Sequence, residues 1–266
     1  MDIKNMTAVI LAGGKGTRIS EESAVRPKPM VTIGGKPILW HILKIYASFG
    51  VRRFIICCGY KSELIKKYFI HMDISNHDSV FCLADGTFSA VLPGTLSEDW
   101  DVILANTGLN TMTAGRILKV REYLKDDEEF FLTYGDGVAD IDLQALLEFH
   151  HKMDKIVTIS AAQPEGRFGA LEISDDGIIE SFREKARKNQ PFVNIGFMVM
   201  RREVFNYLGD GLDMLEKEPF EKMVREREIA SYRHAGFWSP MDNISDRGHL
   251  ERLWAEGAPW KIWQEG

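Results

Sequence analysis

Residues 9–30, VILAGGKGTRISEESAVRPKPM, join a short apolar run to a glycine-rich loop and to a lysine that lies between two prolines. The apolar run predicts a strand, and the loop after it contains Gly13, Gly14 and Gly16. Glycine allows neighbouring backbone N–H groups to turn toward one point, where they can hold phosphate oxygens. The stretch therefore predicts an α/β fold with a phosphate-binding loop after its first strand.

The spacing of this loop excludes two common nucleotide motifs. The pattern G-x-x-x-x-G-K-[ST] is absent, and G-x-G-x-x-G is absent because Ile19 stands where the third glycine would be. One alternative is that the glycines only make a tight turn between a strand and a helix. Arg18 and the sequence Pro27-Lys28-Pro29 favour a binding function, because prolines on both sides of Lys28 stiffen the backbone that presents its ammonium.

The run L-A-G-G-x-G-T-R at 11–18, followed by P-K-P at 27–29, resembles the signature of the sugar-phosphate nucleotidyltransferases. These enzymes join a nucleoside triphosphate to a sugar 1-phosphate and release pyrophosphate. The resemblance extends from Thr7 to Trp263 and is greatest to the glucose-1-phosphate cytidylyltransferase branch. The segments that carry it are GGKPILWHI at 34–42, FIICCGYK at 54–61, TYGDGVAD at 133–140, GRFGAL at 166–171 and GFW-x-PMD at 236–242.

Composition agrees with an enzyme of this kind. The chain has 266 residues, of which 45% are apolar, and this suffices for one large domain spanning residues 1–266. A net charge of −6 argues against a general surface for nucleic acid or for anionic membranes. The apolar run near the N-terminus is too short for a signal peptide or a membrane span, so we expect a cytoplasmic protein.

Alternating patterns predict a mostly parallel, mixed sheet with helices on both faces. The resemblance implies that this is a Rossmann-like nucleotidyltransferase fold with a sugar-binding and oligomerisation extension. Predicted strands cover 7–11, 53–58, 80–84, 101–104, 130–134, 156–161, 170–173, 193–200 and 230–234. Predicted helices cover 37–49, 62–69, 114–124, 142–152, 203–208, 219–227 and 244–256. Cys57 and Cys58 are adjacent in one predicted strand, so we interpret them as core thiols on opposite faces.

Residues 70–110 have no clear periodicity. Such a segment is either an irregular surface excursion or, in an oligomer, a part that reaches a neighbouring subunit. The residues alone leave both alternatives open. The resembling family is oligomeric and uses the equivalent region in subunit contacts, which implies a homo-oligomer here.

Two aspartates are candidate metal ligands. Asp136 follows the apolar run FFLTY directly, at the carboxyl end of a predicted strand, where open α/β sheets place ligands. Asp242 lies in the GFW-x-PMD segment, and the resemblance implies that these two carboxylates hold Mg²⁺, which prefers oxygen ligands. The alternatives are a plain Gly-Asp-Gly turn at Asp136 and a helix cap at Asp242. We expect Asp142 or Ile141 to start the next helix and not to bind metal.

The resemblance also implies the nucleotide site, with Arg18, Lys28 and Asp136 in catalytic roles. Within the segment TGLNTMTAGRI at 107–117, Thr111 and Arg116 are expected to contact CTP; alternatively, Thr111 to Gly115 only cap the helix at 114–124. The complete set of expected nucleotide contacts is Leu11, Ala12, Gly13, Gly14, Lys15, Gly16, Thr17, Arg18, Lys28, Thr111, Arg116 and Asp136.

For the sugar phosphate, the resemblance implies contacts from Gly169, Glu184, Lys185 and Asn194. Two residues in this region depart from the family pattern. Ala186 replaces the proline of the usual E-K-P, and Ile195 replaces the first glycine of the usual N-G-G. Glucose 1-phosphate is the first expectation for the acceptor, and a different phosphorylated acceptor is the alternative.

The expected reaction is an in-line attack by the sugar 1-phosphate on the α-phosphorus of CTP, with Mg²⁺, which yields CDP-glucose and pyrophosphate. No protein nucleophile is required, because a phosphate monoester is already largely ionised near neutral pH. A competing hypothesis is a non-catalytic, nucleotide-sensing subunit with the same fold. Loss of Lys28 or of either aspartate would favour that hypothesis, and all three are present.

Overall fold

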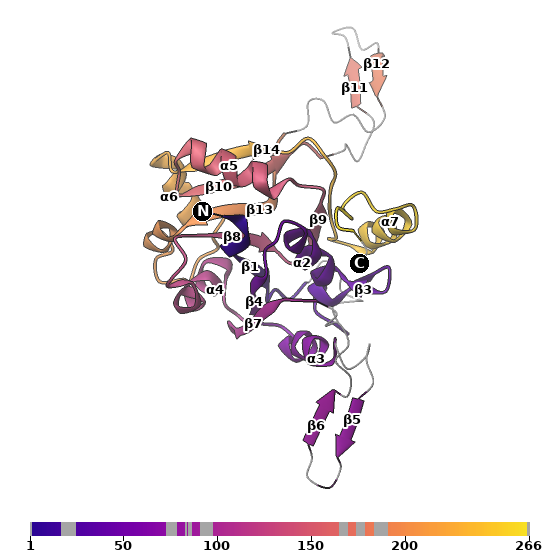
Figure 1. Ribbon diagram of the computed structural model, residues 1–266. Helices are drawn as coiled ribbons and strands as arrows, with labels where there is room; N and C mark the ends of the chain where they lie inside the picture. Colours follow the sequence, from indigo (N-terminus) through magenta and orange to yellow (C-terminus); the bar gives the residue numbers. More distant parts are fainter. Residues whose placement is uncertain are drawn as a thin grey trace.

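The computed structural model describes residues 2–16, 25–72, 79–82, 84, 87–90, 98–164, 170–173, 179–183 and 191–264. Its largest sheet contains seven strands (Figure 1), namely β1 (Thr7–Ala12), β4 (Arg53–Cys58), β7 (Asp101–Asn106), β8 (Glu129–Tyr134), β10 (Val157–Ala162), β13 (Val193–Arg201) and β14 (Ile229–Arg233). The helices are α2 (Ile38–Ser48), α3 (Ser62–Met72), α4 (Thr113–Lys119), α5 (Leu143–Met153), α6 (Glu218–Arg225) and α7 (Ile244–Ala255).

The strand order in this sheet is β14-β10-β13-β8-β1-β4-β7. Only β13 runs antiparallel to its two neighbours, while the β10–β14, β8–β1, β1–β4 and β4–β7 pairs are parallel. The prediction of a mostly parallel mixed sheet is therefore confirmed. Parallel strands need long crossover connections, and the helices supply them.

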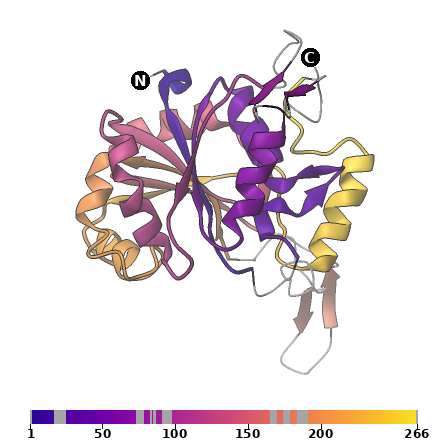
Figure 2. The same cartoon turned by 90° about the horizontal axis from the view of Figure 1, so that it is seen from below.

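Strand β1 lies in the middle of the sheet, and all six of its residues are buried. Burial on both faces is typical of a parallel strand covered by two layers of helices. Ala8, Ile10 and Ala12 face a core with residues of α2, α3, α5 and α7, whereas Val9 and Leu11 face a core with residues of α4 and α6. Figure 2 shows the sheet between these two groups of helices.

The two cysteines follow the same alternation. Cys58 belongs to the first core and Cys57 to the second, so the prediction of buried thiols on opposite faces is confirmed. Burial raises the pKa of the Cys57 thiol to about 12 and that of Cys58 to about 11. Both residues therefore pack as neutral side chains.

Helix α2 shows how the pattern of apolar residues places an element. Ile38, Ile42 and Ile45 recur at helical spacing, and all three are fully buried in the first core. The helix ends before Gly50, which has φ of +93°, a conformation that glycine adopts without strain. The predicted helix at 37–49 is confirmed within one residue at each end.

Several features differ from the prediction, including strands β6 (Thr87–Ala90) and β12 (Ile179–Arg183), which lie outside the predicted strand ranges. The helix predicted at 114–124 is α4 followed by a separate 3-10 helix, Arg121–Leu124, and the helix predicted at 203–208 is a 3-10 helix, Arg202–Asn206. Short 3-10 helices also occur at Ile3–Asn5 and Lys28–Met30. Two small ribbons were not predicted, because strands of two or three residues have no readable periodicity: β2 (Thr32–Ile33) with β3 (Lys36–Pro37), and β9 (Gly137–Ala139) with β15 (Trp238–Pro240).

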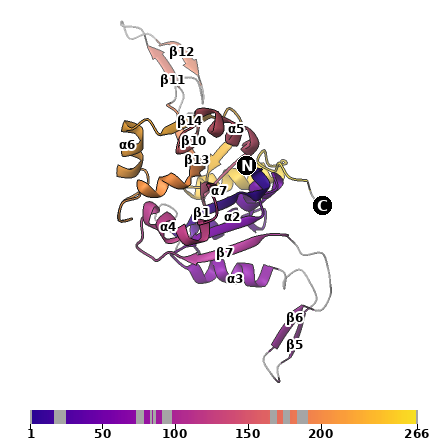
Figure 3. The same cartoon turned by 60° about the vertical axis from the view of Figure 1, so that its left-hand side comes forward.

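Two hairpins project from the body of the molecule in opposite directions (Figures 1 and 3). One is formed by β5 (Ser79–Cys82) and β6 (Thr87–Ala90), the other by β11 (Ala170–Ile173) and β12 (Ile179–Arg183). Each is a two-stranded sheet that no other strand joins within the described part of the chain. The first hairpin lies in the region 70–110 that lacks periodicity.

No helix in the described ranges is long and apolar enough to span a membrane.

Candidate active site

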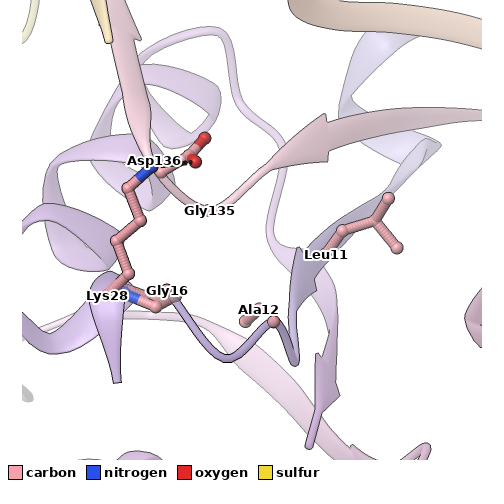
Figure 4. Close-up of a pocket in the computed structure, with 8 residues that line it drawn as sticks. Leu11, Ala12, Gly16, Lys28, Gly135 and Asp136 are labelled. Carbon is pink, nitrogen blue, oxygen red and sulfur yellow. Dashed lines mark hydrogen bonds and ion pairs between the residues drawn. The ribbon is translucent and has the colours of Figure 1, made fainter. Parts of the chain in front are cut away.

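A polar pocket lies at the carboxyl ends of the central strands. It has a volume of about 210 Å³ and is lined by Leu11, Ala12, Gly14, Gly16, Lys28, Pro29, Gly135 and Asp136. These residues come from the ends of the adjacent parallel strands β1 and β8 and from the segment that presents Lys28 (Figure 4). The glycine-rich loop predicted to bind phosphate therefore forms one wall of the pocket.

Close packing where β1 and β8 end favours glycine at position 135. The Gly135 N–H donates a hydrogen bond to the Leu11 carbonyl oxygen at 3.1 Å. A Cβ atom added to Gly135 would lie 3.1 Å from that oxygen and 3.1 Å from Cγ of Pro29. The absence of a side chain thus lets the chain carry Asp136 directly against the glycine-rich loop.

Lys28 begins the 3-10 helix Lys28–Met30, which is preceded by Pro27 in extended conformation and contains Pro29. Its side chain is only 12% exposed and reaches across the pocket to Asp136 (Figure 4). The ammonium Nζ lies 2.6 Å from Oδ2 of Asp136 and 2.7 Å from Oδ1 of Asp242. The lysine therefore bridges two carboxylates that are 106 residues apart in the sequence.

The small ribbon of β9 and β15 explains how the two aspartates meet. Its antiparallel register pairs Gly137 with Pro240, so the residues just outside the ribbon, Asp136 and Asp242, are brought to the same end. The Met241 N–H also donates a hydrogen bond to the backbone carbonyl oxygen of Asp136 at 2.8 Å. The separation of the two carboxylates is therefore fixed by backbone pairing.

Asn243, rather than Asp242, caps helix α7. The Asn243 side chain accepts a hydrogen bond from the Asp246 N–H at 2.9 Å, and Asp246 Oδ2 accepts one from the Asn243 N–H at 3.2 Å. This reciprocal pair is a capping box. Asp246 also accepts the N–H of Asp242 at 2.8 Å, which leaves the Asp242 carboxylate to face Lys28.

Two carboxylates around one cation suit a magnesium ion. Mg²⁺ is usually bound by one or two protein carboxylates, with substrate phosphates and water completing its shell. In the described part of the chain, no group of three or more His, Cys, Asp or Glu side chains could hold a metal by itself. Asp136 and Asp242 are 36% and 29% exposed, so ligands from solvent can reach both.

Arg116 lies beneath the glycine-rich loop and is only 4% exposed. Its Nη2 donates to the Gly13 carbonyl oxygen at 2.9 Å, and its Nη1 donates to Thr107 Oγ1 at 2.6 Å and to the Gly108 carbonyl oxygen at 3.0 Å. Burial lowers the pKa of the Arg116 guanidinium. The structure therefore ties Arg116 to the loop through protein groups, and a direct contact with the nucleotide stays a prediction.

Thr111 lies near Arg116, since both side chains form hydrogen bonds with Thr107. Its hydroxyl donates to the Thr107 carbonyl oxygen at 2.6 Å and is 3.2 Å from Nζ of Lys119. Helix α4 begins after Met112, which provides no side-chain cap. Thr111 thus belongs to the turn before the helix, and its role toward CTP stays a prediction as well.

Asn194, predicted to contact the sugar, is exposed at the start of β13. Its Nδ2 donates to the hydroxyl of Tyr134 at 3.4 Å, and its Oδ1 accepts the Gly196 N–H at 2.8 Å. Ile195 is 3% exposed and packs in the first core. The bulk of Ile195, which departs from the family pattern, therefore fills the interior.

Of the predicted residues, Leu11, Ala12, Gly14, Gly16, Lys28 and Asp136 line one pocket. Asp242 joins them through Lys28, Arg116 holds Gly13, and the Lys15 side chain is exposed. Other predicted residues lie outside the described residues. They are Thr17 and Arg18 of the loop and Gly169, Glu184 and Lys185 of the sugar site, together with Ala186.

Sequence reasoning missed two residues that the site uses. The Thr107 hydroxyl accepts a hydrogen bond from Arg116 and donates one to the Cys58 carbonyl oxygen at 2.7 Å. Glu216 accepts hydrogen bonds from the hydroxyls of Tyr134 and Thr113. Glu216 lies in an irregular segment without a motif, so only the tertiary structure could have revealed it.

Known proteins resemble this chain over nearly its whole length. The model of the nucleotidyl transferase family matches residues 7–258. The chain is 46% identical over 260 residues to the glucose-1-phosphate cytidylyltransferase of Salmonella typhi, covering 97% of this chain and 100% of the relative. It is 42% identical over 260 residues, with the same coverage, to the probable glucose-1-phosphate cytidylyltransferase of Bacillus subtilis.

Solved structures share the fold. HddC from Yersinia pseudotuberculosis, complexed with GMP-PN, superposes with a TM-score of 0.65 at 22% identity, over 94% of this chain and 99% of that protein. A putative glucose-1-phosphate thymidylyltransferase from Bacillus anthracis, in complex with a sucrose, superposes with a TM-score of 0.66 at 13% identity, over 98% of each chain. At these identities the likeness establishes the architecture alone.

Proposed function

The chain belongs to the nucleotidyl transferase family, and we propose that it transfers the cytidylyl group of CTP to glucose 1-phosphate, forming CDP-glucose and pyrophosphate. The choice of substrates is supported by the likeness, over 97% of the chain, to relatives named for this activity. The reaction type is supported by one observation above all. Lys28, Asp136 and Asp242 converge at the mouth of the pocket formed by the glycine-rich loop.

The glycine-rich loop is proposed to hold the triphosphate. Gly14 and Lys15 are exposed at the end of β1, and Gly16 has φ of +61°, a conformation in which a glycine-rich loop can turn N–H groups toward an anion. Arg116 holds the underside of the loop at Gly13. Lys28 brings the positive charge that a triphosphate needs, from a segment stiffened by two prolines. We propose that Arg18, which ends the loop motif, adds to that charge.

Asp136 and Asp242 are proposed to hold Mg²⁺ together with oxygens of the nucleotide. The bound metal would neutralise the negative charge that develops on the α-phosphate in the transition state. The protein's part is to keep both carboxylates at one place, which the β9–β15 ribbon does through its backbone pairing. The Asp242 backbone is held in turn by Asp246.

In the proposed reaction, a phosphate oxygen of the sugar 1-phosphate attacks the α-phosphorus of CTP. A new P–O bond forms as the bond from the α-phosphorus to the bridging oxygen breaks, and pyrophosphate leaves with that oxygen. The attacking phosphate is already ionised, so the protein needs to supply only position and charge. Asn194 is proposed to orient the sugar, with Gly169, Glu184 and Lys185 as further contacts.

For the base, Thr111 and Arg116 are proposed to lie near the cytosine. Selection of cytosine over uracil requires an acceptor for the exocyclic amine. Backbone carbonyl groups of the turn at 107–111 are suitable acceptors, because the turn lies next to the glycine-rich loop and is fixed by Arg116 and Thr111.

We further propose a homo-oligomer that works in the cytoplasm, where CTP is made. An isolated two-stranded hairpin is only marginally stable in water. The β5–β6 hairpin projects from the body, which supports a contact with a second subunit (Figure 3). Light scattering of the purified chain, before and after replacement of residues 73–97 by a short linker, tests this; a monomer in both would contradict it.

The enzymatic proposal is tested by mixing the protein with Mg²⁺, each of the four nucleoside triphosphates and a panel of sugar 1-phosphates, and by measuring pyrophosphate. Release with CTP and glucose 1-phosphate alone is the expected result. Release with CTP and another acceptor would correct the acceptor. No pyrophosphate from any pair, in protein that binds CTP, would instead support a nucleotide-sensing subunit.

A further inference from the structure

A chain of hydrogen bonds connects the proposed sugar side of the pocket to the start of helix α4. The Asn194 side-chain amide donates to the Tyr134 hydroxyl at 3.4 Å, and that hydroxyl donates to Glu216 Oε1. The other carboxylate oxygen, Oε2, accepts the Thr113 hydroxyl at 2.9 Å. Thr113 in turn accepts the Leu215 N–H at 2.7 Å. One carboxylate thus joins residues from three separate segments.

The direction of each hydrogen bond fixes the type of residue at position 216. The Tyr134 and Thr113 hydroxyls each accept an amide N–H, so each has its own proton to donate to Glu216. A group that receives two donors must offer two acceptor atoms, and an ionised carboxylate does so. A glutamine has one acceptor and would lose one of the two contacts. The arrangement therefore requires a carboxylate at this position.

The Tyr134 ring is held in place from the other side. Gly196 has φ of +87°, and a Cβ atom added there would lie 2.6 Å from Cδ2 of Tyr134. The ring therefore packs directly against the backbone of β13, two residues beyond Asn194. Tyr134 is also the last residue of β8, two residues before the proposed metal ligand Asp136.

We propose that Glu216 is a positioning residue, which sets the orientation of Asn194 toward the acceptor through Tyr134 and ties that orientation to helix α4 through Thr113. This inference rests on the proposed function, because Asn194 is the proposed sugar contact. Loss of Glu216 should weaken the acceptor site while the glycine-rich loop and Lys28 continue to bind CTP. Among the described residues, neither Glu216 nor Thr113 lines the pocket itself.

The first experiment compares Glu216→Ala, Tyr134→Phe and the double variant in steady-state kinetics. Each single variant should raise KM for glucose 1-phosphate about five- to tenfold, the effect of losing the one neutral hydrogen bond that orients Asn194, and should change KM for CTP less than twofold. The KM of the double variant should equal that of the more impaired single variant, since both substitutions break the same chain of hydrogen bonds. Multiplied effects, or equal rises in both KM values, would overturn the proposal.

Glu218→Ala provides a matched control two residues away. Glu218 forms an exposed ion pair with Arg225, in which both side chains are 61% exposed. Such pairs contribute little, so this variant should have wild-type kinetics.

Thr113 offers a test from the far end of the chain. Thr113→Ser keeps the hydroxyl and should retain the wild-type KM for glucose 1-phosphate, whereas Thr113→Val removes the bond to Glu216 and should raise it. In a Tyr134→Phe background, the same valine substitution should no longer affect this KM. An undiminished effect there would show that Thr113 acts by another route and would overturn the coupling.

A measurement without turnover separates this inference from the proposed function. The side-chain amide resonances of Asn194, assigned by comparison with Asn194→Asp, should shift in Tyr134→Phe and Glu216→Ala and remain unchanged in Glu218→Ala. Wild-type protein that releases no pyrophosphate from CTP and glucose 1-phosphate would refute the proposed function, while the resonances would still decide the linkage. Unchanged resonances in an active enzyme would refute the linkage alone.

Discussion

The guanidinium of Arg116 donates a hydrogen bond from Nη2 to the Gly13 carbonyl oxygen at 2.9 Å and so connects helix α4 to the glycine-rich loop. A Cβ atom added to Gly13 would lie 2.0 Å from Nη1 of this arginine. The loop and the arginine therefore occupy one closely packed unit, in which Gly13 has no room for a side chain.

Replacing Arg116 with methionine should destabilise the fold. The buried oxygens of Gly13, Thr107 and Gly108 would each lose a charged donor, and we expect the free energy of unfolding to fall by about 2–4 kcal/mol. Urea titration measures this. Lys125→Met, a few residues beyond this helix, is the control, because the Lys125 side chain is 64% exposed. Unchanged stability with a large loss of CTP affinity would assign Arg116 to the nucleotide instead.

Asp136→Asn and Asp242→Asn should each abolish turnover, because each removes a negative charge from the proposed metal site. Asp142→Asn is the matched control. Asp142 caps helix α5 by accepting the Ala145 N–H at 2.9 Å, and asparagine caps equally well. Pyrophosphate release measures all three, and near-normal rates in either of the first two variants would show that the metal is bound elsewhere.

Lys28→Met should change metal binding in a direction opposite to its effect on activity. Without the ammonium, the carboxylates of Asp136 and Asp242 lose the cation that bridges them, and a divalent ion would bind in its place. In the absence of nucleotide we expect Mn²⁺ to bind the variant at least about tenfold more tightly than the wild type. Turnover should fall. Titration calorimetry measures the affinity, with exposed Lys36→Met as control; equal affinities would contradict the prediction.

Two buried histidines should make stability depend on pH. Burial lowers the pKa of His41 and that of His150 to about 4 each, compared with about 6.5 in the unfolded chain. Between these values the unfolded chain binds a proton that the folded chain excludes, so stability is lost as the pH falls from about 6.5 to about 4. Each histidine should contribute a slope of about 1.4 kcal/mol per pH unit near the middle of this window.

Urea titrations at pH 7, 6 and 5 test this. His41→Gln and His150→Gln should each reduce the slope by about one proton's contribution, and the double variant by about two. The comparison uses the slopes, because either substitution also changes stability at neutral pH. His41 donates from Nε2 to the Ile33 carbonyl oxygen at 2.9 Å, and a glutamine amide can also donate. Identical slopes in all four proteins would refute the assignment.

The sequence allowed most of the main sheet and its helices to be predicted, because long elements carry a readable periodicity. Helix α5 illustrates this. Asp142 or Ile141 was expected to begin the helix, and Asp142 is the N-cap. Helix 114–124 was predicted too long, since Val120 interrupts it and the chain continues as a 3-10 helix from Arg121. Apolar spacing alone cannot distinguish one helix from two short ones in line.

The site could be predicted only for residues in segments whose order along the chain matches the family pattern. Lys28, Asp136 and Asp242 come from segments that the family resemblance singled out, and their meeting is observed. The packing of Arg116 under Gly13 and of Glu216 between Tyr134 and Thr113 was not foreseen, because these contacts join residues 82 to 103 positions apart. No local pattern encodes such pairs; they arise from the order of strands in the sheet.

The β9–β15 ribbon fixes the positions of Asp136 and Asp242 independently of the β11–β12 hairpin. Both aspartates lie at one end of this ribbon. The 98 residues between its strands include the β11–β12 hairpin, Asn194 and Glu216. Within that length, the β11–β12 hairpin is a separate two-stranded sheet in the described part of the chain, so it can change without altering the spacing of the two acids. A change of the sugar phosphate that is accepted would then leave the two aspartates in place.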